Sequence, residues 1–231
     1  MKICGFNKTT LLDYPGRVAC TIFLGGCNFR CPFCQNGALV VEADTQPGYS
    51  QDEILAFLKK RKGILDGVCV SGGEPTLAPD LPDFLGRIKE LGYDVKLDTN
   101  GSRPFVVKKL AAAGLIDKVA MDIKACPSNY HVLTGVNVDL DAIRETAGWL
   151  LNGDLDYEFR TTVVRELHSE KDFQEISQWL SGAKSYYLQA YRDSDEVLMP
   201  GFSACSEKEM KNYRDILLET IPVVEIRGMD L

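Results

Sequence analysis

The sequence has little that would place the protein in a membrane or on nucleic acid. The sequence has 231 residues, and no segment of it has the about 18–20 consecutive apolar residues that a transmembrane helix needs. The N-terminus has no charged segment followed by an apolar one, as a targeting sequence would. The 33 acidic residues outnumber the 26 basic ones, giving a net charge of −7, whereas nucleic-acid-binding domains are usually basic. We therefore expect a cytoplasmic protein that binds neither a membrane nor nucleic acid.

Histidine is also scarce, and this bears on the kinds of metal site that are available. The two histidines, His131 and His168, lie far apart in the sequence and are interpreted as surface or loop residues. No second C-x2-C pair is present, although a structural zinc site typically takes four ligands from paired cysteines or histidines. A disulfide framework does not suit a chain without a secretion signal. Zinc and disulfides are therefore disfavoured.

What the sequence does have is a group of three cysteines, Cys27, Cys31 and Cys34, spaced C-x3-C-x2-C in the loop 25–36. Three thiolates on one short loop can converge on one metal centre. A [4Fe–4S] cluster is usually held by four thiolates, so three would leave one iron open for chemistry. An iron–sulfur site is the favoured interpretation. The other five cysteines are interpreted mainly as small apolar core residues: Cys4, Cys20, Cys69, Cys126 and Cys205.

Strand-like and helix-like segments alternate about six times after residue 16. Strands are expected at 17–24, 67–71, 94–98, 118–123, 157–164 and 186–191, with a short last strand at 222–227. Helices are expected from Ser50, over 80–91, 102–114, 139–151 and 169–180, and from Ser206. This alternation predicts a parallel sheet with right-handed crossovers, as an open barrel or a doubly wound sheet.

Polar motifs follow the carboxyl ends of four expected strands, which favours a barrel, since barrel chemistry gathers at that end. The fold class is therefore predicted as α/β, a partial (β/α)6 barrel, in one domain over 1–231. Gly72-Gly73-Glu74-Pro75 is either a tight turn or exposed backbone able to grip a small zwitterion's ammonium group. An Asp at a strand end, such as Asp98 or Asp122, is often only a helix cap.

Other polar residues occur in or after the later strands. Arg160 lies in an apolar strand, where a buried guanidinium needs an anionic partner, either a structural carboxylate or a bound ligand. Gln189 and Arg192, near the end of the strand at 186–191, leave the same choice open.

The cysteine spacing, with Phe33 directly before the third cysteine, resembles the signature of the radical S-adenosylmethionine (SAM) enzymes. The resemblance implies that Cys27, Cys31 and Cys34 hold a [4Fe–4S] cluster whose open iron is chelated by the methionine end of SAM. It also implies reductive cleavage of SAM to a 5′-deoxyadenosyl radical. The Gly72-Gly73-Glu74 segment resembles the element that contacts the amino group of SAM in this family.

Further motifs cover most of the chain and resemble the longer anaerobic ribonucleoside-triphosphate reductase activating proteins. These are glycyl-radical-enzyme activases related to pyruvate formate-lyase activating enzyme. The motifs lie at 9–16, 23–36, 70–76, 98–101, 121–124, 159–164 and 226–228. The resemblance implies hydrogen abstraction from a glycine Cα of the partner reductase, with an external reductant of the flavodoxin or ferredoxin type.

The remaining candidate site residues come partly from their own chemistry. The Lys124 ammonium can pair with the carboxylate of SAM, and the candidate SAM pocket also includes Phe33, Arg160, Gln189 and Arg192. The resemblance to the activases implies a monovalent cation, Na⁺ or K⁺, against that carboxylate. Its ligands would be the side chains of Asp98 and Asp122 and backbone oxygens of Thr99 and Ala120.

Two departures and two alternatives accompany this interpretation. The family's usual Cys-His-Asn is Cys34-Gln35-Asn36 here, and no accessory ferredoxin-like cysteine set is present. One alternative is a radical SAM enzyme that activates another glycyl radical enzyme or modifies a small molecule or RNA. The other, of a different class, is a non-catalytic metal-binding interaction module.

Overall fold

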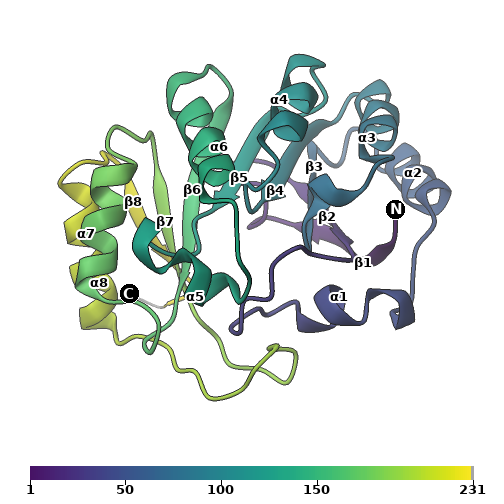
Figure 1. Ribbon diagram of the computed structural model, residues 1–231. Coiled ribbons are helices and arrows are strands. Elements are labelled where there is room, and N and C mark those ends of the chain that lie inside the picture. The colour runs from purple at the N-terminus through teal and green to yellow at the C-terminus, as the bar shows by residue number, and fades with distance from the viewer. Residues whose placement is uncertain (230–231) are drawn as a thin grey trace. The chain divides into compact units, whose positions relative to one another are not determined.

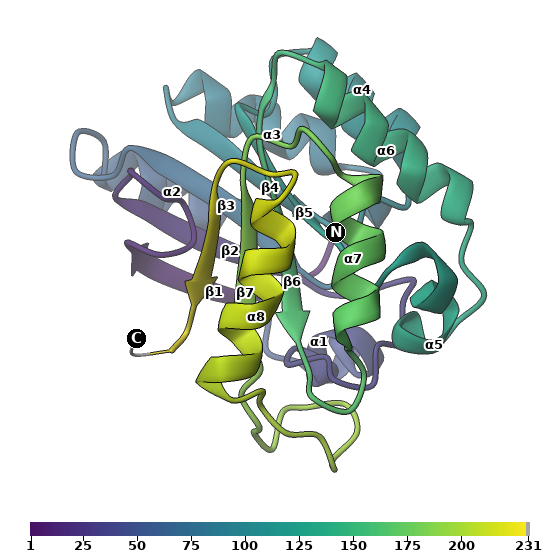
Figure 2. The same ribbon diagram turned by 90° about the vertical axis from the view of Figure 1, so that its left-hand side faces the viewer.

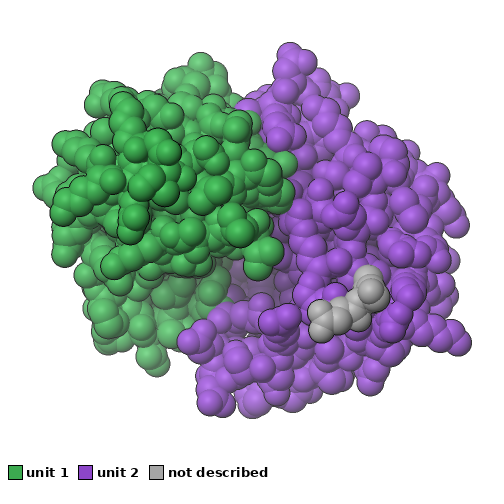
Figure 3. Space-filling view, turned by 180° about the vertical axis from the view of Figure 1, so that it is seen from behind, with its two compact units in different colours: residues 1–28, 36–99, 103–119 green, residues 29–35, 100–102, 120–231 purple. Residues whose placement is uncertain are grey.

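The computed structural model describes residues 1–229 and shows an α/β chain (Figure 1). The chain divides into two compact units, which Figure 3 colours separately. The first unit comprises residues 1–28, 36–99 and 103–119, and the second comprises residues 29–35, 100–102 and those from 120 onward. The expectation of a single domain over 1–231 stays a prediction, and its last two residues lie outside those described.

The sheet has its strands in sequence order, from β1 to β8. The strands are β1 (Ile3–Thr10), β2 (Ala19–Leu24), β3 (Gly67–Gly72), β4 (Asp94–Thr99), β5 (Lys118–Asp122), β6 (Asp156–Val163), β7 (Tyr186–Ala190) and β8 (Val224–Arg227). In the first unit β2, β3 and β4 are parallel, and in the second unit β6, β7 and β8 are parallel. The predicted parallel α/β sheet is thus confirmed.

In the first unit, helices α1 (Gly37–Val41), α2 (Gln51–Lys60), α3 (Leu81–Glu90) and α4 (Pro104–Ala112) accompany β1 to β4. The amide of Glu53 donates to Ser50 Oγ (3.1 Å) and its carboxylate accepts from the amide of Ser50 (2.7 Å), so the capping box expected at the start of α2 is present. Helix α3 buries Phe84 and Ile88 completely. An apolar stripe at helical spacing therefore fixes which face of α3 meets the sheet.

In the second unit, helices α5 (Tyr130–Thr134), α6 (Leu140–Asn152), α7 (Glu170–Trp179) and α8 (Glu207–Leu218) accompany β6 to β8. Helices α7 and α8 lie side by side (Figure 2) and contact each other, and α8 packs on β7 and β8. The ring of Phe173 on α7 stacks on Tyr213 of α8 with 4.4 Å between ring centroids. Capping boxes at Ser169 and Ser206 begin these two helices, as the sequence predicts.

Strand β1 is the main element that the sequence analysis misses. It pairs with β2 in the antiparallel direction, with two irregularities in register. The sequence gives no apolar run here because the strand's outer positions are Asn7, Lys8 and Thr9, which are exposed, while Ile3 and Thr10 are buried. The short helices α1 and α5 are also unpredicted. The short last strand expected at 222–227 is confirmed as β8, over Val224–Arg227.

Among the helices of residues 1–229, none is long and apolar enough to cross a membrane. The longest, α6, has 13 residues.

Candidate functional site

In the first unit, the loop that follows β3 lies directly against the backbone that precedes Cys27. The amide of Gly73 donates to the carbonyl of Leu24 (2.8 Å), and the amide of Glu74 donates to the carbonyl of Gly26 (2.8 Å). A Cβ on Gly73 would lie 2.0 Å from the Gly26 oxygen and 3.3 Å from the Cβ of Cys27. Only glycine at residue 73 permits this approach, which packs the Gly-Gly-Glu segment against Cys27.

Gly72, the last residue of β3, has a different requirement for glycine. Its φ of +119° lies in a region that side-chain-bearing residues rarely adopt, and a Cβ there would meet the Leu24 oxygen at 2.3 Å. The Gly72 carbonyl accepts a hydrogen bond from Asn36 Nδ2 (3.1 Å). The Asn of the Cys34-Gln35-Asn36 sequence therefore ties the end of the cysteine loop to the Gly-Gly-Glu segment.

Glu74 is almost completely buried, at 1% exposure, and its carboxylate organises this loop. Its Oε1 accepts from the amide of Thr76 (3.1 Å), the hydroxyl of Thr76 (2.5 Å) and the hydroxyl of Thr99 (2.8 Å). Hydrogen bonds to an ionised acceptor are stronger than neutral ones. The two predicted elements, at the ends of β3 and β4, are thus joined by Glu74 and Thr99. Thr76 was not predicted.

Asp98, near the carboxyl end of β4, has a basic partner that the sequence analysis did not identify. Lys96 Nζ lies 2.6 Å from Asp98 Oδ1, and Lys96 is 1% exposed. The two residues are two positions apart on one strand, so they share a face of the sheet. That spacing, with a lysine in a buried strand, was the signal available in the sequence. Lys96 therefore already balances the charge of this carboxylate. The Na⁺ or K⁺ ion predicted at Asp98 stays a prediction.

In the second unit, the cysteine loop forms a turn in which the amide of Cys34 donates to the carbonyl of Cys31 (3.0 Å). Backbone bonds attach this turn to the segment after β7: Leu198 donates to the Cys34 carbonyl (3.0 Å) and Met199 to the Pro32 carbonyl (2.9 Å). The loop that carries two of the three cysteines is therefore held by main-chain hydrogen bonds.

The start of the same loop is attached to the end of α5. The amide of Arg30 donates to the carbonyl of Thr134 (2.8 Å). Gly135 ends α5 with φ +66°, and a Cβ there would lie 2.3 Å from the Arg30 oxygen. A left-handed residue after a helix is usually glycine, and here the close approach also demands it.

Asp122, the last residue of β5, lies between two cations. Its Oδ1 accepts from Arg160 Nε (2.5 Å) and its Oδ2 from Lys124 Nζ (3.0 Å). Burial by itself would raise the pKa of Asp122, but the charges of Arg160 and Lys124 outweigh it, so the pKa is strongly lowered. The sequence left open whether Arg160 pairs with a structural carboxylate or with a bound ligand. In the structure it pairs with the carboxylate of Asp122.

Lys124 has its charge fixed by the same cluster. Burial opposes the ammonium, but the negative charges of Asp122 and of Cys31 and Cys34 as thiolates favour it, so the pKa of Lys124 is raised. The amide of Lys124 donates to the hydroxyl of Tyr130 (3.3 Å). The lysine is thus a permanent cation within electrostatic range of both cysteines.

The two histidines, interpreted as surface or loop residues, differ in burial: His168 lies in the loop between β6 and α7 but is not at the surface. His131 is exposed on α5, but His168 is 4% exposed. His168 contacts the backbone of Lys124 through Nε2 (3.1 Å) and its ring meets the edge of Phe33 at 6.3 Å between centroids. Its apolar surroundings come from distant parts of the chain, so no local pattern revealed them.

Gln189 and Arg192 lie at and after the end of β7. Gln189 is half-buried and pairs in register with Arg227 on β8, whereas Arg192 is exposed and donates to the carbonyl of Gly228 (3.3 Å). The carbonyl of Arg192 accepts from Gln35 Nε2 (2.8 Å). The residue that departs from the family's Cys-His-Asn pattern thus ties the cysteine loop to the segment after β7.

The donor chemistry of the cysteines fits an iron–sulfur cluster. None of the eight cysteines forms a disulfide, and four of the five outside the cysteine loop are buried, with Cys4 half-buried. Cys27 belongs to the first unit, and Cys31 and Cys34 to the second. Within residues 1–229, no three His, Cys, Asp or Glu side chains are grouped as a metal site. The assignment of the three cysteines as ligands therefore stays a prediction.

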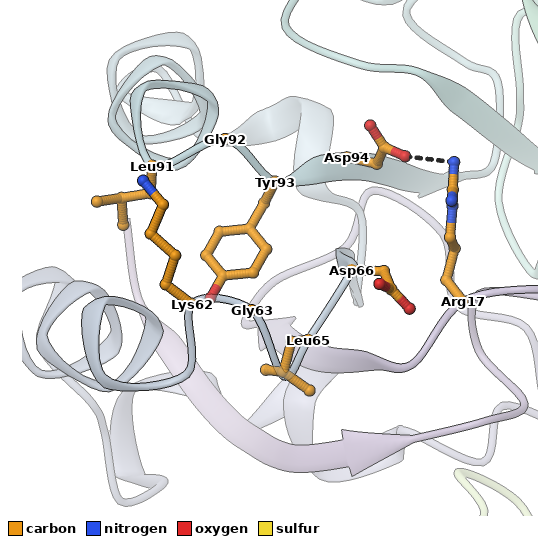
Figure 4. A pocket seen from close by; sticks show the side chains of 9 residues that line it. All are labelled: Arg17, Lys62, Gly63, Leu65, Asp66, Leu91, Gly92, Tyr93 and Asp94. Carbon is orange, nitrogen blue, oxygen red and sulfur yellow. Dashed lines mark ion pairs between the residues drawn. The ribbon is translucent and has the colours of Figure 1, made fainter.

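A pocket of about 400 Å³ lies in the first unit, away from these motifs (Figure 4). Arg17 forms an ion pair with Asp94 across it (2.6 Å), and Asp66 accepts from the amide of Val18 (3.0 Å). The pocket lies at the amino ends of β2, β3 and β4, whereas Glu74 and Thr99 lie at carboxyl ends. Its lining residues are Arg17, Lys62, Gly63, Leu65, Asp66, Leu91, Gly92, Tyr93 and Asp94.

Comparison with known proteins places these features in a family. The sequence pattern described as the Radical SAM superfamily matches residues 21–180. The chain is 31% identical over 243 residues to "Putative glycyl-radical enzyme activating enzyme MJ1227" of Methanocaldococcus jannaschii, covering 99% of this chain and 96% of that one. It is 36% identical over 121 residues to "Probable GTP 3',8-cyclase" of Thermococcus kodakarensis, covering 52% of this chain and 38% of that one.

Solved structures agree on the fold. SuiB of Streptococcus suis superposes with a TM-score of 0.71 at 15% identity, over 91% of this chain and 49% of that chain. A domain of pyruvate-formate lyase-activating enzyme from Bacteroides vulgatus superposes with a TM-score of 0.56 at 22% identity, over 70% of this chain and 99% of that one. Identities this low establish the fold alone, and they confirm the predicted radical SAM type of partial barrel.

The family match covers more than half of the chain, and the archaeal relative matches it over almost its full length. Membership implies a [4Fe–4S] cluster and SAM as cofactors. The chain therefore belongs to the radical SAM superfamily and is a homologue of glycyl-radical-enzyme activating enzymes.

Proposed function

We propose that this protein generates a glycyl radical on anaerobic ribonucleoside-triphosphate reductase. The observation that carries the proposal is the main-chain contact between Glu74 and Gly26, which holds the Gly-Gly-Glu segment against Cys27. An activase must bind SAM next to its cluster, and this contact supports that arrangement within one unit. Similarity to an activase relative over 99% of the chain supports the class of reaction.

Cys27, Cys31 and Cys34 would hold the cluster, each as a thiolate. When bound, the cluster and SAM supply a one-electron reductive cleavage that ends in abstraction of a hydrogen atom from the partner's glycine. Lys124 lies within electrostatic range of Cys31 and Cys34. A cation beside two thiolates offsets part of their mutual repulsion. This supports Lys124 as a neighbour of two of the proposed ligands.

The first unit would bind the amino group of SAM. Carbonyl oxygens in the 72–74 segment are acceptors suited to an ammonium group, in addition to the hydrogen bond that the Gly72 carbonyl accepts from Asn36. Glu74, through its bonds to Thr76 and Thr99, holds the segment in place. Thr99 thereby contributes to the SAM site as part of the support for Glu74.

The second unit would bind the carboxylate of SAM through Lys124. Asp122 and Arg160 orient the Lys124 ammonium, because Asp122 accepts hydrogen bonds from both cations. Phe33, Gln189 and Arg192 would complete the pocket. The proposal includes a Na⁺ or K⁺ ion bound by Asp98, Asp122, Thr99 and Ala120. The ion would compete with Lys96 for Asp98, and with Lys124 and Arg160 for Asp122.

The main competing function is another radical SAM reaction, on a different glycyl radical enzyme or on a small molecule. The similarity to a protein named as a GTP 3',8-cyclase covers 52% of this chain and gives GTP as the small molecule to test. An RNA substrate is disfavoured by the net charge of −7.

The test is an anaerobic assay of the full chain reconstituted with iron and sulfide. SAM, dithionite or reduced flavodoxin, and the anaerobic reductase from the same organism are added, and the EPR spectrum and 5′-deoxyadenosine are recorded from one sample. We expect a glycyl doublet on the reductase and stoichiometric deoxyadenosine. A Cys34→Ala variant serves as the negative control, and Cys205→Ala, a buried cysteine far along the chain, as its matched control.

The three possible outcomes separate the alternatives. Deoxyadenosine without the doublet contradicts the reductase as partner, and the assay is repeated with GTP and with other glycyl radical enzymes. Neither signal from a well-loaded cluster contradicts the enzyme and leaves a metal-binding interaction module. A doublet that persists in Cys34→Ala contradicts the ligand assignment.

A further inference from the structure

In the second unit, the side chain of His168 contacts both Phe33 of the cysteine loop and the backbone of Lys124. Its protonation pattern follows from the hydrogen bonds. The amide of Val164 lies 3.1 Å from Nδ1, and an amide can only donate, so Nδ1 accepts. The Val164 carbonyl is more distant from Nδ1, at 3.3 Å. The proton of the neutral ring therefore sits on Nε2, which donates to the carbonyl of Lys124 (3.1 Å).

The imidazole cannot turn away from this arrangement, because aromatic rings pack on it from two sides. Its face stacks on Phe173 at 5.9 Å between centroids, and Phe173 stacks in turn on Tyr213 at 4.4 Å. Phe33 contacts it edge to face at 6.3 Å with an interplanar angle of 72°. The ring is 4% exposed. The contacts come from α7, α8 and the cysteine loop, so His168 is fixed by the core of the second unit.

The group that His168 holds is the main chain of Lys124. That residue is anchored on both sides of its Cα: its amide donates to Tyr130 Oη (3.3 Å) and its carbonyl accepts from His168. Between these anchors, its ammonium reaches Asp122 Oδ2 (3.0 Å). Small movements of the carbonyl would therefore displace the ammonium from the Asp122 carboxylate and from the side chains of Cys31 and Cys34.

We propose that His168 is a positioning residue that keeps the Lys124 ammonium in register with the Cys31–Cys34 turn. It does so through two contacts on one rigid ring, the Nε2–H bond to Lys124 and the edge contact with Phe33. This inference rests on the proposed function in one respect, that Cys31 and Cys34 hold the cluster and Lys124 binds SAM. His168 itself does not touch a reacting atom in this assignment.

The test uses two substitutions with different predicted consequences. His168→Phe keeps an aromatic ring against Phe33 and Phe173 but removes both hydrogen bonds. His168→Gln keeps a side-chain donor that can reach the Lys124 carbonyl. His131→Gln, on the exposed face of α5, is the matched control. Circular dichroism and thermal unfolding first establish that each variant is folded.

The first readout needs no cluster. In the apoprotein, ¹⁵N NMR of the imidazole is expected to show the neutral Nε2–H tautomer for His168. Alkylation of Cys31 and Cys34 by iodoacetamide, followed by mass spectrometry, is expected to be several-fold slower in His168→Phe than in wild type, because the displaced Lys124 ammonium no longer stabilises the reacting thiolates. His168→Gln and His131→Gln are expected to react at the wild-type rate, and Cys205 is expected to be unaffected in all four proteins.

The second readout is SAM binding to the reconstituted protein. We expect the SAM dissociation constant to rise about tenfold in His168→Phe, the effect of losing one hydrogen bond, and to return close to wild type in His168→Gln. A purely structural role would lower the melting temperature of the variants and leave the dissociation constant unchanged, which would overturn the inference. So would an Nδ1–H tautomer, or equal alkylation rates in His168→Phe and wild type.

Failure of the proposed function has a different signature. If the wild-type protein loads no cluster or binds no SAM, the function is contradicted while the tautomer and the alkylation rates still decide the role of His168. If the wild type binds SAM and the reductase acquires its radical, but His168→Phe behaves as wild type in every readout, the function stands and the positioning role falls.

Discussion

The carbonyl oxygen of Gly26 lies where a Cβ of residue 73 would have to be, at 2.0 Å from the position that this atom would take. The approach is between two backbones, so no side-chain rotation relieves it. The Gly-Gly-Glu segment can follow β3 in this way only because residue 73 is glycine, and the loop before Cys27 depends on it.

Gly73→Ala is therefore expected to destabilise the protein and to impair cluster assembly. Forcing a methyl group into a filled space costs about 1–3 kcal/mol, and here the displaced group precedes a predicted cluster ligand. Thermal unfolding and the iron content after reconstitution measure the two effects. Gly86→Ala in α3 is the matched control, since its Cβ would meet its nearest neighbour only at 3.9 Å, and alanine favours a helix. Equal stability of the two variants would contradict the steric argument.

The cysteine assignment predicts a graded result across the eight thiols. Alanine substitution of Cys27, Cys31 or Cys34 is expected to remove the 4Fe–4S absorbance and EPR signals and to abolish SAM cleavage, because a cluster with two thiolate ligands is not retained. Cys69→Ala and Cys205→Ala are expected to lower stability by about 1–2 kcal/mol through lost packing, with SAM cleavage retained. Cleavage that survives substitution of any loop cysteine would exclude it as a ligand.

The sequence predicts the regular elements well because the relevant information is local. Ser50 with Glu53, Ser169 with Asp172 and Ser206 with Glu209 mark three helix starts, and all three form capping boxes. Buried parallel strands give apolar runs, which is how β3 and β7 are recognised. Strand β1 is not recognised because three of its eight residues, Asn7, Lys8 and Thr9, are exposed and polar.

The residues that sequence reasoning misses are those whose environment is assembled from distant segments. His168 is surrounded by Phe33, Phe173 and the Lys124 backbone, none of which is near it in sequence except Phe173. Lys96 is a different case, because its spacing from Asp98 on a strand was visible but unused. The resemblance of motifs to a known family identified candidate site residues. It did not identify the contacts that hold those residues in position.

Asp122→Asn is expected to be strongly destabilising, because Arg160 and Lys124 lose the carboxylate that they share. The three side chains are 24%, 13% and 21% exposed, so the effect falls near the lower end for a broken buried ion pair, about 3 kcal/mol. Urea unfolding at pH 7 measures it. Asp141→Asn, whose carboxylate is 91% exposed in its pair with Arg144, is expected to change stability by less than about 0.5 kcal/mol.

The same pair of variants tests the electrostatic origin of this effect by its pH dependence. The lowered pKa of Asp122 means that its stabilising contribution is complete above the unfolded value of about 3.9 and is lost as pH falls toward the folded value. The stability difference between wild type and Asp122→Asn should therefore shrink in acid. A difference that is independent of pH would point to a packing effect instead.

His168 gives the protein a second, separate pH dependence. Burial lowers its pKa below the unfolded value of about 6.5, while the nearby Asp172 carboxylate and the backbone of Lys124 and Val164 oppose the shift. Below pH 6.5, His168 binds a proton in the unfolded chain but stays neutral in the folded protein. The free energy of unfolding therefore falls as pH falls. The limit is about 1.4 kcal/mol for each pH unit between the two pKa values.

Denaturation of wild type, His168→Phe and His131→Gln between pH 7.5 and 5 measures this slope. His168→Phe should lose part of the acid destabilisation and His131→Gln should keep all of it, whereas identical slopes in the three proteins would show that folding does not change the pKa of His168.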